Sequence, residues 1–133
     1  MQPDAMAGAR VLIAETDPIT LRLLEAVFGI CWCIVRGVSD PHDALREADG
    51  FRPKVVVLRF DEVGSPSLEL ARSLRLRPWA YQTVILGLTA NPTVITEGIA
   101  KAAGCDALLT LPFDTRALAR TEADLLLRRQ GDS

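Results

Sequence analysis

The sequence lacks several features that would assign a function at once. Its net charge is -2 over 133 residues, so the charge balance does not favour a nucleic-acid partner. No apolar run approaches the ~18 residues of a membrane span. The opening ten residues also lack the apolar stretch of a signal peptide. We therefore expect a cytoplasmic protein with no membrane partner and no nucleic-acid partner.

Motifs for catalysis and for cofactors are equally scarce. Cys31 and Cys33 are separated by one residue, and Cys105 is distant, so the cysteines form neither a C-x-x-C pair nor a zinc pattern. The glycine-rich loops that hold nucleotide phosphates, G-x-G-x-x-G and G-x-x-x-x-G-K, are absent. No serine, histidine and acid follow strand ends as a hydrolase triad would. We expect no enzyme activity, no cofactor and no metal.

The sequence does contain a regular alternation of apolar runs and amphipathic segments. Hydrophobic residues make up 49% and charged residues 24%, which is typical of a globular domain. Strands are predicted at 10–14, 32–38, within 53–64, at 83–88 and at 106–111, and a helix is predicted after each of them. Five strands alternating with five helices indicate a parallel sheet covered on both faces. We predict an α/β, (βα)5 flavodoxin-like three-layer sandwich with strand order 2-1-3-4-5, spanning residues 10–130 after a flexible tail at 1–9.

Helix boundaries are indicated by capping residues. Asp17 followed by Pro18 predicts the start of the first helix, and Ile19, Leu23, Val27 and Phe28 are expected to form its buried stripe. Gly50 is expected to stop the second helix, Ser67 to cap the third, Gly104 to end the fourth and Asp114 to cap the last.

One arginine is unexpected in this pattern. Arg59 follows the apolar residues 55–58 near the end of a predicted core strand, although guanidinium groups are rarely buried without a partner. Glu15 and Asp17 follow the first strand, which neighbours the third in the predicted sheet. We therefore expect Arg59 to pair with one or both carboxylates. The alternative is that its side chain extends to solvent and pairs loosely or not at all.

Four segments in this order resemble the receiver domains of bacterial response regulators. They are VLIAETDP (11–18), PKVVVLRFDEVGSPSLEL (53–70), ILGLTA (85–90) and AGCDALLTLPFD (103–114). The resemblance implies that Glu15 and Thr16 stand where the family has its acidic Mg²⁺ ligands. It also implies that Arg59 stands at the phospho-acceptor aspartate. Thr89 keeps the hydroxyl residue that bonds the phosphoryl group, whereas Leu111 and Leu108 replace the family's lysine and its aromatic reporter.

These departures imply a degenerate pocket, formed by Glu15, Thr16, Asp17, Arg59, Thr89 and Leu111. Phosphoryl acceptance needs a carboxylate nucleophile, which arginine cannot supply. One Mg²⁺ carboxylate and the lysine that would neutralise the phosphoryl charge are also missing. We therefore expect a pseudo-receiver that signals without phosphorylation and acts as a protein–protein interaction module in bacterial two-component signalling.

The resemblance also implies an interaction surface, because receiver domains often bind partners through their fourth helix, fifth strand and fifth helix. Candidate interface residues are Lys101, Leu108, Arg116 and Arg120, together with two aromatics before the fourth strand, Trp79 and Tyr81. Solvated helix faces and aromatics that cap the core are the alternatives. The expected partner is a histidine kinase, a downstream effector or a second copy of the chain.

Two other functions remain open from the sequence. The chain could be phosphorylated at a non-standard acid such as Asp61, or it could bind a small anionic ligand near Arg59.

Overall fold

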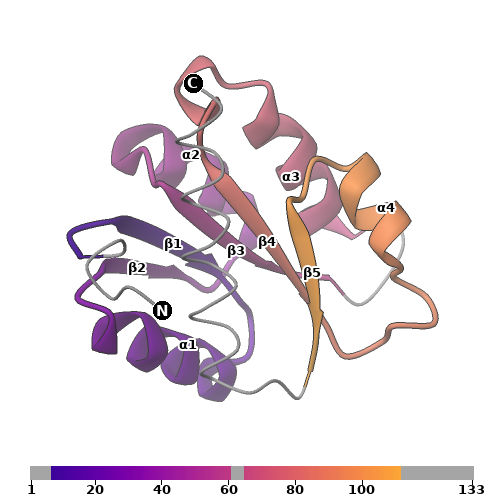
Figure 1. Cartoon of the computed structure of the whole chain (residues 1–133), viewed down its shortest axis with the longest axis horizontal. Coiled ribbons are helices and arrows are strands. Elements are labelled where there is room, and N and C mark those ends of the chain that lie inside the picture. Colours follow the sequence, from indigo (N-terminus) through magenta and orange to yellow (C-terminus); the bar gives the residue numbers. More distant parts are fainter. Residues whose placement is uncertain (1–6, 61–64, 112–133) are drawn as a thin grey trace.

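A five-stranded parallel sheet forms the centre of the computed structural model, which describes residues 7–60 and 65–111 (Figure 1). The strands are β1 (Arg10–Ala14), β2 (Ile34–Val38), β3 (Val55–Arg59), β4 (Val84–Thr89) and β5 (Ala107–Thr110). Their order in the sheet is β2-β1-β3-β4-β5, and all four neighbouring pairs are parallel. The predicted fold class and strand order are therefore confirmed.

Most of the described helices that connect these strands begin at proline. They are α1 (Pro18–Ile30), α2 (Pro41–Phe51), α3 (Pro66–Arg75) and α4 (Glu97–Ala102), with a short 3-10 helix, η2 (Pro78–Ala80), before β4. Only α4 departs from this rule, because Thr96 caps it and no proline follows. Proline has no N–H group, and at the first helical position this loses no hydrogen bond, because an N–H there would have no partner within the helix. The last helix predicted after Asp114 lies outside the described residues.

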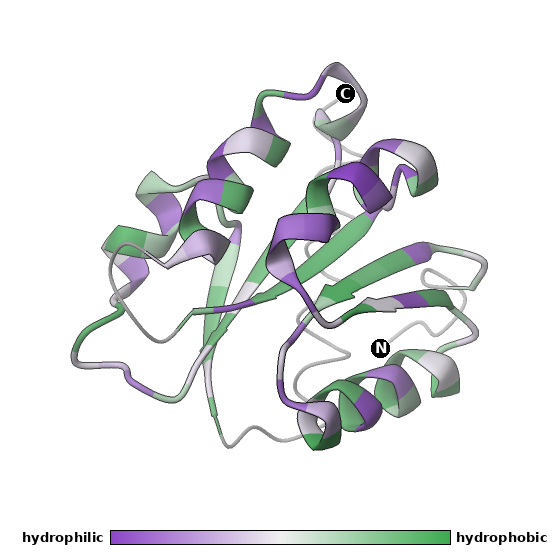
Figure 2. Ribbon diagram, turned by 180° about the vertical axis from the view of Figure 1, so that it is seen from behind, coloured by the Kyte–Doolittle hydropathy of each residue, from purple (hydrophilic) through white to green (hydrophobic). Residues whose placement is uncertain are grey.

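Alternate residues of each strand face opposite layers, so the sheet has a core on each side. On one side Leu12 and Val56 pack with the apolar faces of α2, α3 and α4. On the other side Val11 and Val57 pack with Leu24 and other residues of α1. Figure 2 shows the central strands hydrophobic along most of their length, as expected for strands that are covered on both faces.

The buried stripe of α1 differs from the prediction. Ile19 is 78% exposed and Leu23 is 47% exposed, whereas Leu24, Val27 and Phe28 are buried. Leu24, Val27, Phe28 and the following Cys31 are spaced i, i+3, i+4 and i+7, which places them on one helix face. The prediction was right for Val27 and Phe28 but chose Ile19 and Leu23 where the structure buries Leu24. Apolar residues occur on more than one face of α1, and the sequence pattern alone does not decide which of them are buried.

Three predicted boundaries also shift. β2 begins at Ile34 and not at Trp32, because Trp32 has a left-handed φ of 65° and an exposed side chain. α2 continues past Gly50 to Phe51, and Arg52 ends it in the left-handed conformation with φ 49°. α3 begins after Ser65, so Ser67 is a buried residue inside the helix and not its cap.

The residues just before β1 make ordered backbone contacts. The amide of Gly8 donates to the carbonyl of Trp32, and the carbonyl of Ala9 accepts from Ile34, so ordered structure begins within the segment expected as a tail.

Gly104 has φ 105° directly after α4, where it was predicted to end this helix. In the described part of the chain, no helix is both long enough and apolar enough to cross a membrane.

Candidate functional site

The carboxyl ends of β1 and β3 bring Arg59 and Glu15 together. Arg59 is the last residue of β3, and Glu15 follows the last residue of β1. Ala14 is paired with Leu58 in the register of these strands, so one further step along both strands places Glu15 beside Arg59. The backbone amide of Glu15 also donates to Val38 of β2, which anchors this position on its other side.

An ion pair joins these two side chains. Arg59 Nη1 donates to Glu15 Oε1 over 2.7 Å. The Glu15 side chain is 2% exposed and that of Arg59 is 25% exposed, so the carboxylate is almost entirely removed from water. A buried carboxylate needs a counter-charge and hydrogen bonds to remain ionised, and a guanidinium supplies both. The pairing expected for Arg59 is therefore present with Glu15.

Asp17, the second carboxylate considered for Arg59, has a different role. Its carboxylate accepts hydrogen bonds from the backbone N–H and the hydroxyl of Thr20, at 3.1 Å and 2.6 Å. These bonds cap α1 and lower the pKa of Asp17 below its ordinary value, with a smaller contribution from the charge of Arg59. Thr16, between the two acids, is exposed.

Thr89 and Leu111 occupy the neighbouring strand ends. Thr89 is fully buried at the end of β4, and its hydroxyl oxygen accepts the backbone N–H of Asn91 over 3.0 Å. The amide of Leu111 donates to the carbonyl of Thr89 over 2.7 Å, and its side chain packs with the core on the α1 side of the sheet. Leu111 therefore contributes an apolar contact and no charge to this edge.

A close contact between Phe60 and Gly87 was not predicted from the sequence. Phe60 is fully buried directly after Arg59, and a Cβ placed on Gly87 would lie 2.5 Å from its ring. The same Cβ would lie 3.1 Å from the side chain of Leu108. The phenyl ring thus fills the space above Gly87 of β4, beside the side chain of Leu108. A glycine inside an otherwise apolar strand was the available signal.

The candidate interface residues lie at different ends of the molecule. Lys101 is exposed on α4 and Leu108 is half-buried on β5, on the same side of the sheet edge. Trp79 is half-buried, packs against the core, and donates from its indole N–H to Asp49 over 3.0 Å. Tyr81 is exposed. Arg116 and Arg120 lie outside the described residues.

No family model matches the sequence, and no curated protein matches it, but solved structures share its fold. Chemotaxis protein CheY4 of Vibrio cholerae superposes with a TM-score of 0.79 at 21% identity, covering 90% of this chain and 99% of that one. The receiver domain of the sensor histidine kinase PA1611 from Pseudomonas aeruginosa, whose structure holds magnesium in its active site cleft, gives 0.79 at 23% identity over 90% and 98%. A candidate response regulator from Chloroflexus aurantiacus gives 0.82 at 22% identity over 90% and 98%. The chain therefore has the receiver fold.

Magnesium does not fit the residues found at the corresponding edge of this chain. Mg²⁺ in proteins is held by one or two carboxylates together with phosphate oxygens and water. Glu15 already binds the guanidinium of Arg59 at 2.7 Å, and a dication beside that fixed positive charge would be repelled. Thr16 brings no carboxylate. Within residues 7–60 and 65–111, no group of three or more His, Cys, Asp or Glu side chains is arranged to hold a metal ion.

Proposed function

We propose that this chain is a phosphorylation-independent receiver-fold module that acts in bacterial cytoplasmic signal transduction by binding another signalling protein. One observation carries the proposal: the Arg59–Glu15 ion pair stands where the fold's phosphoryl chemistry would require a nucleophilic aspartate and a metal-binding carboxylate. Arginine has no nucleophilic oxygen, so the pair stabilises the pocket in a single charge state and does not react.

The remaining residues of the pocket support the same proposal. Leu111 contributes an apolar side chain in place of a lysine, so no ammonium is available there to neutralise an added phosphoryl group. The Phe60 ring occupies the space above Gly87 beside Leu108, so movement of an aromatic reporter cannot serve as a switch. The module has no catalytic residue in this proposal, and its output depends on its surface.

The surface we propose for the partner includes α4 and β5, with Lys101 and Leu108 as its described members. The occupant is a histidine kinase, a downstream effector or a second copy of this chain. Binding through this surface requires no phosphodonor, because Arg59 cannot accept a phosphoryl group. Anion binding at Arg59 is disfavoured, since the guanidinium already contacts Glu15 at 2.7 Å.

Intact-mass analysis after treatment with acetyl phosphate and Mg²⁺ tests the chemical half of the proposal. The wild-type chain should gain no phosphoryl group. A variant combining Thr16→Asp, Arg59→Asp and Leu111→Lys supplies the three missing groups and serves as the control in which an adduct should form. A phosphoryl adduct on the wild-type chain, at Asp61 or any other acid, would contradict the proposal.

A pull-down tests the binding half. Wild type, Arg59→Asp and Lys101→Glu are used as baits without phosphodonor, and bound proteins are identified by mass spectrometry. We expect wild type to retain a signalling protein and Lys101→Glu to lose it while keeping its circular dichroism spectrum. Recovery that depends on prior treatment with a phosphodonor would refute phosphorylation-independent action.

A further inference from the structure

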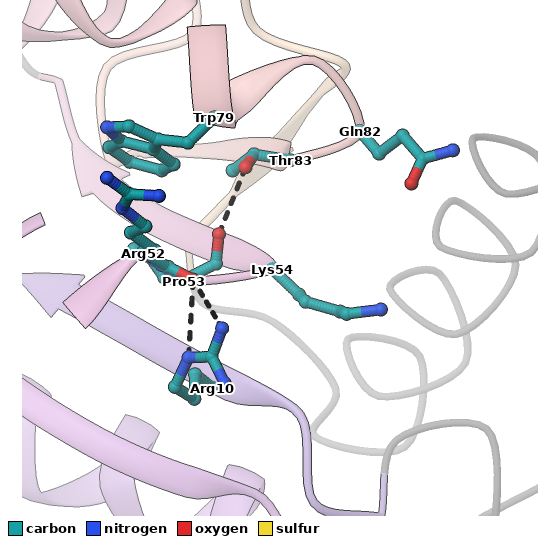
Figure 3. Close-up of a pocket in the computed structure, with 7 residues that line it drawn as sticks. All are labelled: Arg10, Arg52, Pro53, Lys54, Trp79, Gln82 and Thr83. Atoms are coloured by element: carbon teal, nitrogen blue, oxygen red, sulfur yellow. Dashed lines mark hydrogen bonds between the residues drawn. The ribbon is translucent and has the colours of Figure 1, made fainter. Parts of the chain in front are cut away.

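A second candidate site lies at the opposite edge of the sheet, where the strands begin. A pocket of about 210 Å³ opens there between the amino ends of β1, β3 and β4 (Figure 3). Its lining comprises Arg10, Arg52, Pro53, Lys54, Trp79, Gln82 and Thr83. Three of these seven residues are cations and none is an acid. Neither the proposed function nor the receiver comparison assigns any role to this edge.

Arg10 is held rigidly at the base of the pocket. Its Nε donates to the carbonyl of Phe51 over 2.8 Å, and its Nη2 donates to the carbonyl of Arg52 over 3.1 Å. These carbonyls end α2, where the helix dipole presents partial negative charge. Arg10 therefore neutralises the helix end and leaves its other guanidinium nitrogen, Nη1, directed to no described acceptor.

Arg52 and Lys54 are positioned by their backbones, and both side chains are exposed. Arg52 has a left-handed φ of 49° and donates its amide to Ala48 over 2.7 Å. Lys54 donates its amide to Arg10 and accepts from Val84, each over 2.8 Å. In the part of the chain that the structure describes, neither side chain has a salt bridge or a hydrogen bond.

Asp49 interacts electrostatically with Arg52 but is hydrogen-bonded to other side chains. Asp49 accepts from Arg77 over 2.9 Å and 3.2 Å, and from the indole N–H of Trp79 over 3.0 Å. The hydrogen bonds from Arg77, followed by that from Trp79, lower the pKa of Asp49, and the positive charges of Arg77 and Arg52 contribute to the same shift. The charge of Lys54 is therefore left facing solvent, whereas the charge of Arg52 is offset in part by the carboxylate of Asp49.

Neutral groups complete the walls. Pro53 and Thr83 are buried at the floor, where the hydroxyl of Thr83 donates to the carbonyl of Pro53 over 3.0 Å. Figure 3 shows Arg52 turned toward the indole of Trp79 on one side of the pocket, with Lys54 and Gln82 on the other side. The amide of Gln82 can donate or accept a hydrogen bond, and it adds a neutral polar group to the lining.

We propose that this pocket binds a small anion with two or more negative charges, of the class of organic phosphates and di- or tricarboxylates. Two guanidinium groups and one ammonium group line this pocket without a lining acid, which makes it complementary to such charge. The volume is smaller than that of a typical drug-sized ligand site, which favours a compact anion. Arg10 and Glu15 are five positions apart along the chain of β1, or about 16 Å, so this site is separate from the Arg59–Glu15 pair.

Fluorescence of Trp79 provides a direct test, because the indole lines the pocket. The chain has only one other tryptophan, Trp32, which is exposed and is removed as Trp32→Phe to leave Trp79 as the reporter. Pyrophosphate, citrate and acetate are titrated at constant low ionic strength. We expect a saturable change with pyrophosphate or citrate, and the stronger of the two identifies a phosphate or a carboxylate ligand. Acetate should give no saturation.

Charge variants decide whether the change arises in the pocket. Lys54→Gln and Arg52→Asn should each weaken binding about tenfold, as expected for the loss of one charge-assisted contact. Asparagine is chosen at 52 because it tolerates the left-handed conformation. Arg72→Gln is the matched control, since Arg72 is exposed on α3 and pairs only with the nearby Glu69.

Amide chemical shifts of Lys54, Gln82 and Thr83 give a second readout that does not depend on fluorescence. Saturable shifts at these residues, weakened in both pocket variants and unchanged in Arg72→Gln, would support the site. The proposal is overturned if neither polyanion produces saturable shifts, or if the two pocket variants and the control respond equally.

Discussion

Replacing Arg59 with methionine should strongly destabilise the protein. The substitution removes the charge but keeps an unbranched apolar side chain, so little cavity is created. Glu15 is 2% exposed, and without Arg59 its carboxyl group would be left in the core without a counter-charge. Breaking a fully buried pair costs ~3–5 kcal/mol. Because the Arg59 side chain is 25% exposed and admits some water, we expect about 2–4 kcal/mol.

Urea denaturation followed by circular dichroism measures this loss. Arg72→Met at the exposed Arg72–Glu69 pair is the control and should change the free energy of unfolding by less than about 0.5 kcal/mol. A second substitution, Glu15→Gln, in the Arg59→Met background should recover most of the stability, because it removes the stranded charge. A loss below about 1 kcal/mol for Arg59→Met, the range of exposed pairs, would refute the reasoning.

Three further predictions concern packing, acid stability and thiol reactivity. Gly87→Ala should destabilise the protein by about 1–3 kcal/mol, because the added methyl group overlaps the Phe60 ring, and Phe60→Leu should restore part of the loss in urea melts. The folded-state pKa of Asp49 is lowered, so its stabilising contribution is present above the unfolded value of 3.8 and is lost as the pH falls through the folded pKa. Thermal melts should therefore show a smaller acid dependence in Asp49→Asn, and an unchanged dependence would contradict this role. Burial raises the pKa of Cys105 to about 12, so iodoacetamide at pH 8 should label half-buried Cys33 first and Cys105 only after unfolding; early labelling of Cys105 in a peptide map would show the thiol to be accessible.

Low sequence identity to the solved receiver structures accompanies a well-preserved fold in this chain. The neighbouring receiver structures superpose with TM-scores of 0.79 to 0.82 at 21 to 23% identity. The fold depends on apolar strands and helix faces, which many sequences can supply. The carboxyl edge of the sheet depends on particular charged groups, and one arginine in that position changes its chemistry. The function of this chain therefore depends on the residues at the carboxyl edge of the sheet, and the shared fold does not determine it.

Much of the architecture was predictable because the signals for it are local. The buried strands are short apolar runs, and Asp17 with Pro18 indicates where α1 begins. Alternation of strands and helices then restricts the sheet to parallel pairing with crossovers. Boundaries were less certain, as Ser67 and Gly50 show, because capping depends on which of several nearby residues adopts the required backbone conformation.

The amino-acid sequence by itself determined the receiver fold, the strand order and the placement of a cation at the end of β3. Only the tertiary structure decided that Glu15 and not Asp17 binds this cation, because the carboxylate of Asp17 is used to cap α1. The tertiary structure also decided that Arg10, Arg52 and Lys54 share one pocket. Residues from separate strands meet only when the register of the sheet and the end of α2 are set, and these depend on long-range packing that local sequence patterns do not contain.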